Sequence, residues 1–99
     1  VIRHIVLFQL KSSLTEDFRK EVCRKFKSDI ESLQEEICYI KEIHVGINAN
    51  PSETYHICLE STFADFNDLE KYAKHPLHLQ AAQQIRPYIE HRSCVDYEI

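Results

Sequence analysis

Residues 2–11 read IRHIVLFQLK, and this stretch decides the fold. Apolar and polar side chains alternate along it with the period of a β-strand. Its apolar residues fall on both faces of such a strand: Ile2, Val6, Phe8 and Leu10 lie beside His4 on one face, and Ile5 and Leu7 lie on the other. Both faces of this strand must therefore be covered. Helices of the same chain can supply one cover, but 99 residues are too few to supply a second layer comfortably.

A long amphipathic helix is predicted after this strand. Ser13 and Glu16 match the S-x-x-E capping box, so we expect the helix to begin there and to continue to about Glu36. Apolar residues recur every three or four positions, which places them in one stripe along the helix. We expect the charged residues between them to face solvent. The stripe consists of Phe18, Val22, Phe26, Ile30, Leu33 and Ile37.

The rest of the chain holds three more strands and two shorter helices. A second helix starts at Asp65 and is broken by Pro76, which is well placed in the first turn of a third helix. Gly46 is the only glycine, and at a strand end it predicts a bulge or a close backbone approach. The predicted strands cover Tyr39–Ile47, Tyr55–Phe63 and Arg92–Ile99, and the third helix covers Leu77–Tyr88.

The predicted order of elements is β-α-β-β-α-α-β, the split βαβ, ferredoxin-like arrangement with an extra helix. We therefore expect an α+β fold in which residues 1–99 form one domain, with a four-stranded antiparallel sheet and the helices on one of its faces. The other face, which carries Ile5 and Leu7, would be a large exposed apolar patch. Two-fold pairing of two such sheets would cover the patch, so the sequence predicts a homodimer.

Charge and composition narrow the possible partners and locations. The formal net charge of -4 argues against a general nucleic-acid-binding protein, which needs a basic face. No apolar run of about 18 residues is present, so we predict no membrane-spanning helix. We expect no signal peptide, because the strand pattern begins at Ile2. The four cysteines lack C-x-x-C spacing and lie in apolar patterns, which predicts buried free thiols, no disulfide and a cytoplasmic location.

The segment YAKHPLH, residues 72–78, holds the side chains best suited to chemistry. Tyr72 and His75 are three residues apart and share a helix face, and the turn at Pro76 would bring His78 close to both. A tyrosine hydroxyl and an imidazole can form an acid/base pair, because imidazole exchanges protons near neutral pH. Asp96 in the last strand would orient His78 by accepting the N–H on the other side of its ring.

The same residues also have structural interpretations. A tyrosine near a helix end commonly packs with its hydroxyl at the rim, and a His-Pro pair at a helix junction commonly serves as a cap or turn. His75 and His78 provide only two metal ligands, and nothing in the sequence shows that His4 is a third, so we predict no metal and no cofactor. The histidines expected at the surface or rim are His44, His56 and His91.

Four motifs together match one known family. They are RHIVLF at residues 3–8, V-G-x-N at 45–48, Y-x-x-H-P-x-H at 72–78 and V-D-Y at 95–97. In this combination the chain resembles the stress-responsive A/B barrel (Dabb) family across nearly its full length. The resemblance implies a dimeric α+β barrel with a small-molecule pocket between sheet and helices.

The resemblance also implies roles for individual residues. Most members of the family have no assigned activity, but one plant member is a polyketide cyclase that closes a ring by an aldol reaction. By analogy His78 would be the catalytic base, Tyr72 would position a carbonyl group and Asp96 would hold the ring of His78. The other residues around the implied pocket, which would take a small hydrophobic carbonyl or phenolic ligand, are His4, Val6, Phe8, Leu59 and His75.

Four positions depart from the cyclase pattern. Ile57 stands where the cyclase has a further pocket histidine, Ala81 replaces a bulky aromatic residue, and Arg92 and Cys94 replace aliphatic residues. We therefore expect a different substrate. Three functions stay open: a small-molecule-binding domain without catalysis, a cofactor-free lyase or cyclase, and a cofactor-free monooxygenase. An enzyme would need an open, largely apolar cavity that touches Tyr72 and His78.

Overall fold

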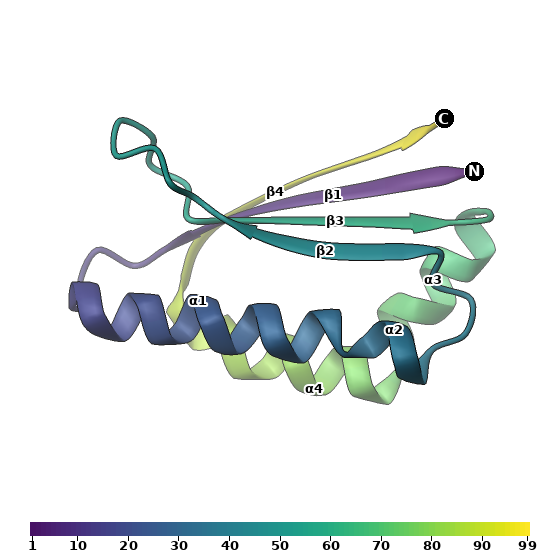
Figure 1. The fold of residues 1–99 in the computed structure, drawn as a ribbon, viewed down its shortest axis with the longest axis horizontal. Helices are drawn as coiled ribbons and strands as arrows, with labels where there is room; N and C mark the ends of the chain where they lie inside the picture. Colours follow the sequence, from purple (N-terminus) through teal and green to yellow (C-terminus); the bar gives the residue numbers. More distant parts are fainter.

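The chain folds into two layers, a twisted sheet and a layer of helices, as Figure 1 shows. The computed structural model describes residues 1–99. The sheet is antiparallel with the strand order β2-β3-β1-β4, so β1 is central and pairs with both β3 and β4. The strands are β1 (Ile2–Leu10), β2 (Glu42–Ile47), β3 (Ile57–Phe63) and β4 (Ile89–Glu98).

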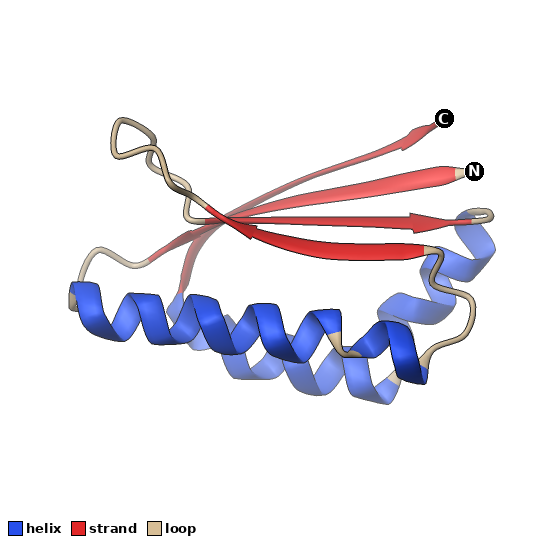
Figure 2. Ribbon diagram, viewed as in Figure 1, coloured by secondary structure: helices blue, strands red, loops and turns tan.

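All the helices cover the same face of the sheet (Figure 2). They are α1 (Glu16–Glu31), α2 (Leu33–Glu36), α3 (Phe66–Lys74), α4 (Pro76–Ile85) and the short 3₁₀ helix η1 (Arg86–Tyr88). The predicted α+β, split βαβ arrangement with helices on one face is therefore confirmed. The last strand begins at Ile89, three residues before the predicted Arg92, because it follows directly on η1 without a connecting loop.

The beginning of α1 differs from the prediction. Thr15 caps the helix, because its Oγ1 accepts a hydrogen bond from the N–H of Phe18 at 3.2 Å. The predicted capping box of Ser13 with Glu16 is wrong, since the helix starts at Glu16 and Ser13 lies outside the cap. Asp65, by contrast, caps α3 by accepting from the N–H three residues further on.

The predicted long helix is interrupted at Ser32. Its hydroxyl donates to the carbonyl of Asp29 at 2.7 Å, and only the short helix α2 follows. A serine that bonds back to its own backbone competes with the helical hydrogen bonds, which explains the break. The apolar stripe also shifts in the first half of α1: Cys23 is buried, while Phe18 is 40% exposed and packs edge-on against Tyr88.

The core lies between the sheet and the helices. The side chains of β1 that face the helices are Ile2, Val6, Phe8 and Leu10, and all four are buried. Gly46 does not mark a bulge, because β2 and β3 pair without a register shift and the nearest atom to an added Cβ would lie at 3.9 Å. The β1–β4 pair does shift register, between Gln9 and Leu10.

The opposite face of the sheet carries exposed apolar side chains. Leu7 of β1 is 36% exposed and Val95 of β4 is 55% exposed, and Ile5 lies directly opposite Val95 in the strand register. Tyr97 adds an exposed aromatic ring on the same face. No helix covers this face (Figure 1). The apolar face that the sequence predicted is therefore present, and we call Ile5, Leu7, Val95 and Tyr97 the open-face patch.

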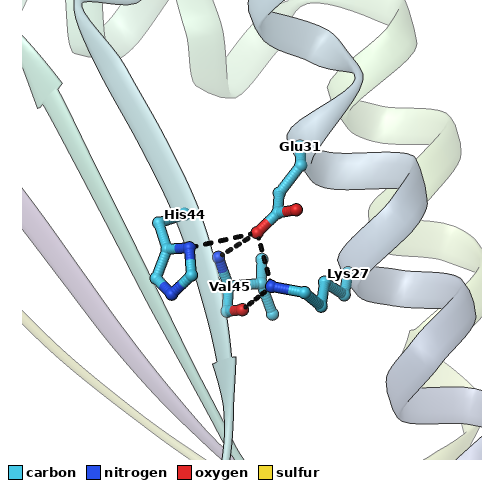
Figure 3. A network of polar contacts seen from close by, with 4 residues as sticks. All are labelled: Lys27, Glu31, His44 and Val45. Carbon is cyan, nitrogen blue, oxygen red and sulfur yellow. Dashed lines mark hydrogen bonds and ion pairs between the residues drawn. The ribbon is translucent and has the colours of Figure 1, made fainter.

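Charged side chains of α1 cover the outer edge of β2. Glu31 accepts from the N–H of Val45 at 3.0 Å, and Lys27 donates to the carbonyl of Val45 at 2.6 Å (Figure 3). His44 lies 3.2 Å from the same carboxylate. The prediction that the charges of this helix simply face solvent is therefore wrong for Lys27 and Glu31. Side chains that occupy edge groups block pairing with another strand, which protects β2 from aggregation.

Replacing Glu31 by alanine is expected to destabilise the protein by roughly 1–3 kcal/mol, because the N–H of the buried Val45 loses its acceptor. Burial alone would raise the pKa of Glu31, but hydrogen bonds from Lys27 and Val45 and the charges of Lys27 and His44 hold it below its usual 4.5. This contribution is therefore present above pH 4.5 and is lost as the pH falls through the lower folded-state pKa.

Urea titrations of wild type and Glu31→Ala between pH 7 and pH 3 would measure this difference. We expect the two stability curves to converge on acidification. Glu70→Ala is the matched control, because Glu70 also pairs with a lysine four residues away but lies in solvent. A Glu31→Ala effect no larger than that of the control would contradict the edge-protection role.

The structure also tests the predictions about the cysteines and about membrane-spanning helices. All four cysteines are free, but only Cys23 is buried; Cys38 and Cys94 are exposed, so the prediction of four buried thiols is wrong. None of the helices combines the length and apolar character needed to cross a lipid bilayer.

Candidate functional site

A cavity of about 210 Å³ lies between the sheet and the helices. Its floor includes His4, Val6 and Phe8 of β1 and Leu59 of β3, all of which were predicted to line a pocket. The remaining lining residues come from α1, α4, η1 and β4: Phe26, Ile30, His78, Ala82, Ile85, Arg86, Ile89 and Arg92. Eight of the twelve lining residues are hydrophobic, so the polar groups are few and their positions matter.

His78 enters this cavity from the first turn of α4. Pro76 begins that helix, which fixes the backbone just before His78. The Nδ1 of His78 lies 3.1 Å from the carbonyl oxygen of Ala73, the residue before the last of α3. Because a carbonyl only accepts, Nδ1 must carry the proton, and Nε2 is left with a free lone pair.

The surroundings of His78 favour its neutral form. Burial lowers its pKa, and the hydrogen bond to Ala73 opposes this effect. The nearby charges of His4 and Arg92 lower the pKa further, and His75 acts in the same direction. At neutral pH the imidazole is therefore uncharged and able to accept a proton at Nε2.

Tyr72 of α3 packs directly against His78. The ring centroids of Tyr72 and His78 are 4.4 Å apart. On the neighbouring strand β3, the ring centroid of Phe63 lies 5.1 Å from that of Tyr72. Tyr72 is 1% exposed, and the protein provides no hydrogen-bond partner for its hydroxyl. Burial raises the pKa of this phenol, so it stays protonated. Tyr72 is thus close to His78 but is not among the residues that line the cavity.

His75 has a structural position at the junction of α3 and α4. Its Nδ1 accepts from the N–H of Leu77 at 3.1 Å, which caps α4. His75 does not line the cavity, so the structure does not place it with the predicted ligand-binding residues. The structural interpretation of the His-Pro pair as a helix cap therefore describes His75.

Asp96 contacts a different histidine from the one predicted. Its Oδ1 bonds to Nδ1 of His4, the residue opposite it in the β1–β4 register, and it makes no hydrogen bond to His78. The prediction that Asp96 holds the ring of His78 is wrong, because the carbonyl of Ala73 takes that place. Cys94 completes this group: its sulfur lies 3.7 Å from His4 Nδ1 and 3.7 Å from Asp96 Oδ1.

Two residues of β4 received no role from the sequence. Arg92 lines the cavity and Cys94 joins the His4–Asp96 pair. A signal was available, because Arg92, Cys94 and Asp96 are spaced by two and must share one face of a strand. The strand register that places this face beside His4 is not visible in the sequence.

A second hollow, of about 310 Å³, lies between α1 and the α4–η1 segment. Phe18, Val22 and Tyr88 line it, and none of the predicted site residues does. Its titratable side chains are Glu21, Lys25, Asp29 and Tyr88. It contains no histidine or cysteine to act as a base or nucleophile near neutral pH, so the smaller cavity beside His78 is the better candidate site.

Comparison with known families explains this arrangement. The family model described as "Stress Responsive A/B Barrel Domain" matches residues 2–99. The chain belongs to this family. The resemblance that the four motifs predicted is thereby confirmed.

Solved structures of several other proteins show the same fold. A dimeric protein of unknown function with a ferredoxin-like fold, from Bacteroides fragilis, is 41% identical with a TM-score of 0.97, covering 99% of this Dabb domain and 95% of that chain. A hydroxynitrile lyase from Passiflora edulis is 25% identical with a TM-score of 0.80, covering 99% and 92%. A putative antibiotic biosynthesis monooxygenase from Nitrosomonas europaea is 12% identical with a TM-score of 0.80, covering 100% and 98%, and shares the fold alone. No curated protein matches this Dabb domain by sequence.

Proposed function

We propose that the cavity beside His78 binds a small, largely apolar molecule with a carbonyl or phenolic group, and that His78 accepts a proton from it. The observation that supports this most strongly is the fixed tautomer of His78. Its Nδ1 proton is held by the carbonyl of Ala73, so the basic Nε2 is the nitrogen left to meet a ligand. A neutral imidazole in a largely apolar cavity suits removal of a proton from carbon next to a carbonyl.

The size of the cavity limits the ligand. A volume of about 210 Å³ lies below the range of roughly 300–1,000 Å³ that is typical of pockets for drug-sized ligands. Phe8, Phe26 and Ile85 present apolar surface, which suits an aromatic or short aliphatic body. Arg92 and Arg86 offer positive charge that would stabilise an enolate oxygen once the proton has left.

This chemistry corresponds to the lyase or cyclase hypothesis. It is supported by the Passiflora edulis relative, a lyase on the same fold, and by the family resemblance to a plant polyketide cyclase. The alternative is a binding domain without catalysis, in which His78 only orients the ligand. The monooxygenase hypothesis has the least support. The monooxygenase from Nitrosomonas europaea is only 12% identical and shares the fold alone.

We also propose that the chain functions as a homodimer through the open-face patch. The patch is exposed, apolar and uncovered by helices (Figure 1). The Bacteroides fragilis relative, at 41% identity, is dimeric. Two-fold pairing would bury Ile5, Leu7, Val95 and Tyr97 of both subunits. Free thiols in such a dimer suit a reducing compartment such as the cytoplasm.

Acetophenone is a suitable probe, because it combines an apolar ring with a carbonyl and exchangeable hydrogens on the adjacent carbon. Wild type is expected to show a higher melting temperature with acetophenone. At a ligand concentration a hundred times the dissociation constant, the free energy of unfolding should rise by roughly 2.7 kcal/mol. In D₂O wild type should also speed deuterium uptake at the methyl carbon, followed by NMR. His78→Gln keeps a donor for Ala73 but has no basic nitrogen, so it should lose this exchange.

His75→Asn is the matched control, since asparagine is a good helix cap and only the imidazole is lost. We expect His75→Asn to retain both binding and exchange. Binding without exchange in wild type would support the non-catalytic domain instead. Exchange that survives His78→Gln, or that disappears in His75→Asn, would contradict the assignment of the base.

A further inference from the structure

We propose that His4, Cys94 and Asp96 form a binding site for one zinc ion at the rim of the cavity. The ligand atoms would be His4 Nδ1, Cys94 Sγ and Asp96 Oδ1, which all lie within 4.8 Å of one another. This site is separate from the proton transfer proposed for His78. It also differs from the metal site considered from the sequence, which rested on His75 and His78.

The sheet brings these three side chains together. Asp96 lies directly opposite His4 in the β1–β4 register, and Cys94 lies opposite Val6, one step along the same face. Residues spaced by two on a strand point to the same side, so the sulfur and the carboxylate converge on the imidazole from one direction. Because all three are placed by regular strand pairing, the site does not depend on a loop.

Two of the three separations between the ligand atoms fit tetrahedral zinc. Zinc bonds are about 2.3 Å long to sulfur and about 2.0–2.1 Å long to nitrogen or oxygen. In a tetrahedral site, the sulfur therefore lies about 3.6 Å from each nitrogen or oxygen ligand. The observed separations, Cys94 Sγ to His4 Nδ1 and Cys94 Sγ to Asp96 Oδ1, are both 3.7 Å. Only the His4–Asp96 pair, which is in direct hydrogen-bond contact, would have to open to admit the ion.

The identity of the donors favours zinc over harder ions. A thiolate combined with imidazole is a soft to intermediate donor set, which suits Zn²⁺ better than Mg²⁺ or Ca²⁺. The thiolate of Cys94 and the carboxylate of Asp96 would together balance the charge of the dication. Cys94 is exposed, so an ion can reach the sulfur from solvent. Three protein ligands leave a fourth position for water or substrate, as in catalytic rather than structural zinc sites.

A buried polar residue lies on the other side of His4. Ser61 is directly opposite His4 on β3, is 1% exposed, and has a hydroxyl for which the protein provides no partner. Metal-bound histidines usually donate their second N–H to a neighbouring acceptor, which fixes the ring. Ser61 lies next to His4 on the same face of the sheet, and its hydroxyl would have to turn toward His4 to accept this N–H when Nδ1 binds the ion. The row Ser61, His4, Asp96 crosses the three adjacent strands β3, β1 and β4.

Cobalt titration of the reduced protein tests this site without any organic ligand. We expect one Co²⁺ per chain, with a thiolate-to-cobalt charge-transfer band in the near ultraviolet that added Zn²⁺ abolishes by displacement. Cys94→Ser should remove the band and weaken zinc binding by roughly 100-fold or more, since even outer-shell changes cost about 10–100-fold. Asp96→Asn should keep the band but weaken binding.

Cys38→Ser is the matched control, because Cys38 is also exposed and free but lies outside the cluster. It should bind cobalt and zinc as wild type does. The proposal would be overturned by a wild type without the charge-transfer band, by a band that survives Cys94→Ser, or by a band lost in Cys38→Ser. None of these outcomes affects the exchange test of His78, so the two proposals fail separately.

Discussion

The Leu7→Glu variant is expected to run as a monomer where wild type runs as a dimer. Leu7 lies in the middle of the open-face patch and is 36% exposed in the single chain. In a two-fold interface each substitution occurs twice, so two carboxylates would be buried in an apolar contact. A penalty on the order of 4 kcal/mol corresponds to roughly a thousandfold weaker dimer. Light scattering at micromolar concentration measures the mass directly.

Leu79→Glu is the matched control for this experiment. Leu79 is similarly exposed, at 43%, but lies on α4 on the other side of the molecule. It should remain a dimer. A Leu7→Glu variant that stays dimeric, or a Leu79→Glu variant that dissociates, would place the interface away from the open-face patch.

Replacing Tyr72 by phenylalanine is expected to stabilise the protein, although it removes a polar group from the core. The hydroxyl of Tyr72 is buried, and the protein provides it with no hydrogen-bond partner. Burying such a group costs about 1–3 kcal/mol, which the variant would recover in part. Each 1 kcal/mol corresponds to roughly 4–8 °C in the melting temperature of a domain of this size.

Thermal and urea unfolding of Tyr72→Phe measure this gain. Tyr39→Phe is the control, because Tyr39 is only half-buried and should change little. A loss of stability in Tyr72→Phe would contradict this account, because it would mean that the hydroxyl has a stabilising partner.

Periodicity was enough to predict most of the fold. The alternation in β1 predicted apolar side chains on both faces of the sheet, and the order of elements predicted the α+β arrangement. The errors lie at element ends, where local competition decides. Thr15 replaced Ser13 as the cap, and Ser32 broke the helix, because side chains that bond to nearby backbone shift a helix end by a few residues without changing the apolar pattern.

The site was only partly predictable for a different reason. The family resemblance implied that His4, Val6, Phe8, Leu59 and His78 surround one pocket, and the structure brings these five together in one cavity. The sequence did not show which histidine Asp96 contacts, because that contact depends on strand register and on the distance from β4 to α4. Cys94 was missed because an apolar pattern predicted burial, whereas β4 is an edge strand that is largely exposed.

The protonation of His78 tests the central claim most directly, since the proposed chemistry requires a neutral ring with a free Nε2. Long-range ¹H–¹⁵N correlation spectra of histidine-labelled protein, recorded across a pH titration, report both the tautomer and the pKa. The structure predicts a proton on Nδ1, held by the carbonyl of Ala73, and a pKa below the usual 6.5 because the ring is buried. A proton on Nε2, or a pKa above 6.5, would leave the cavity without its base and would contradict the proposed function.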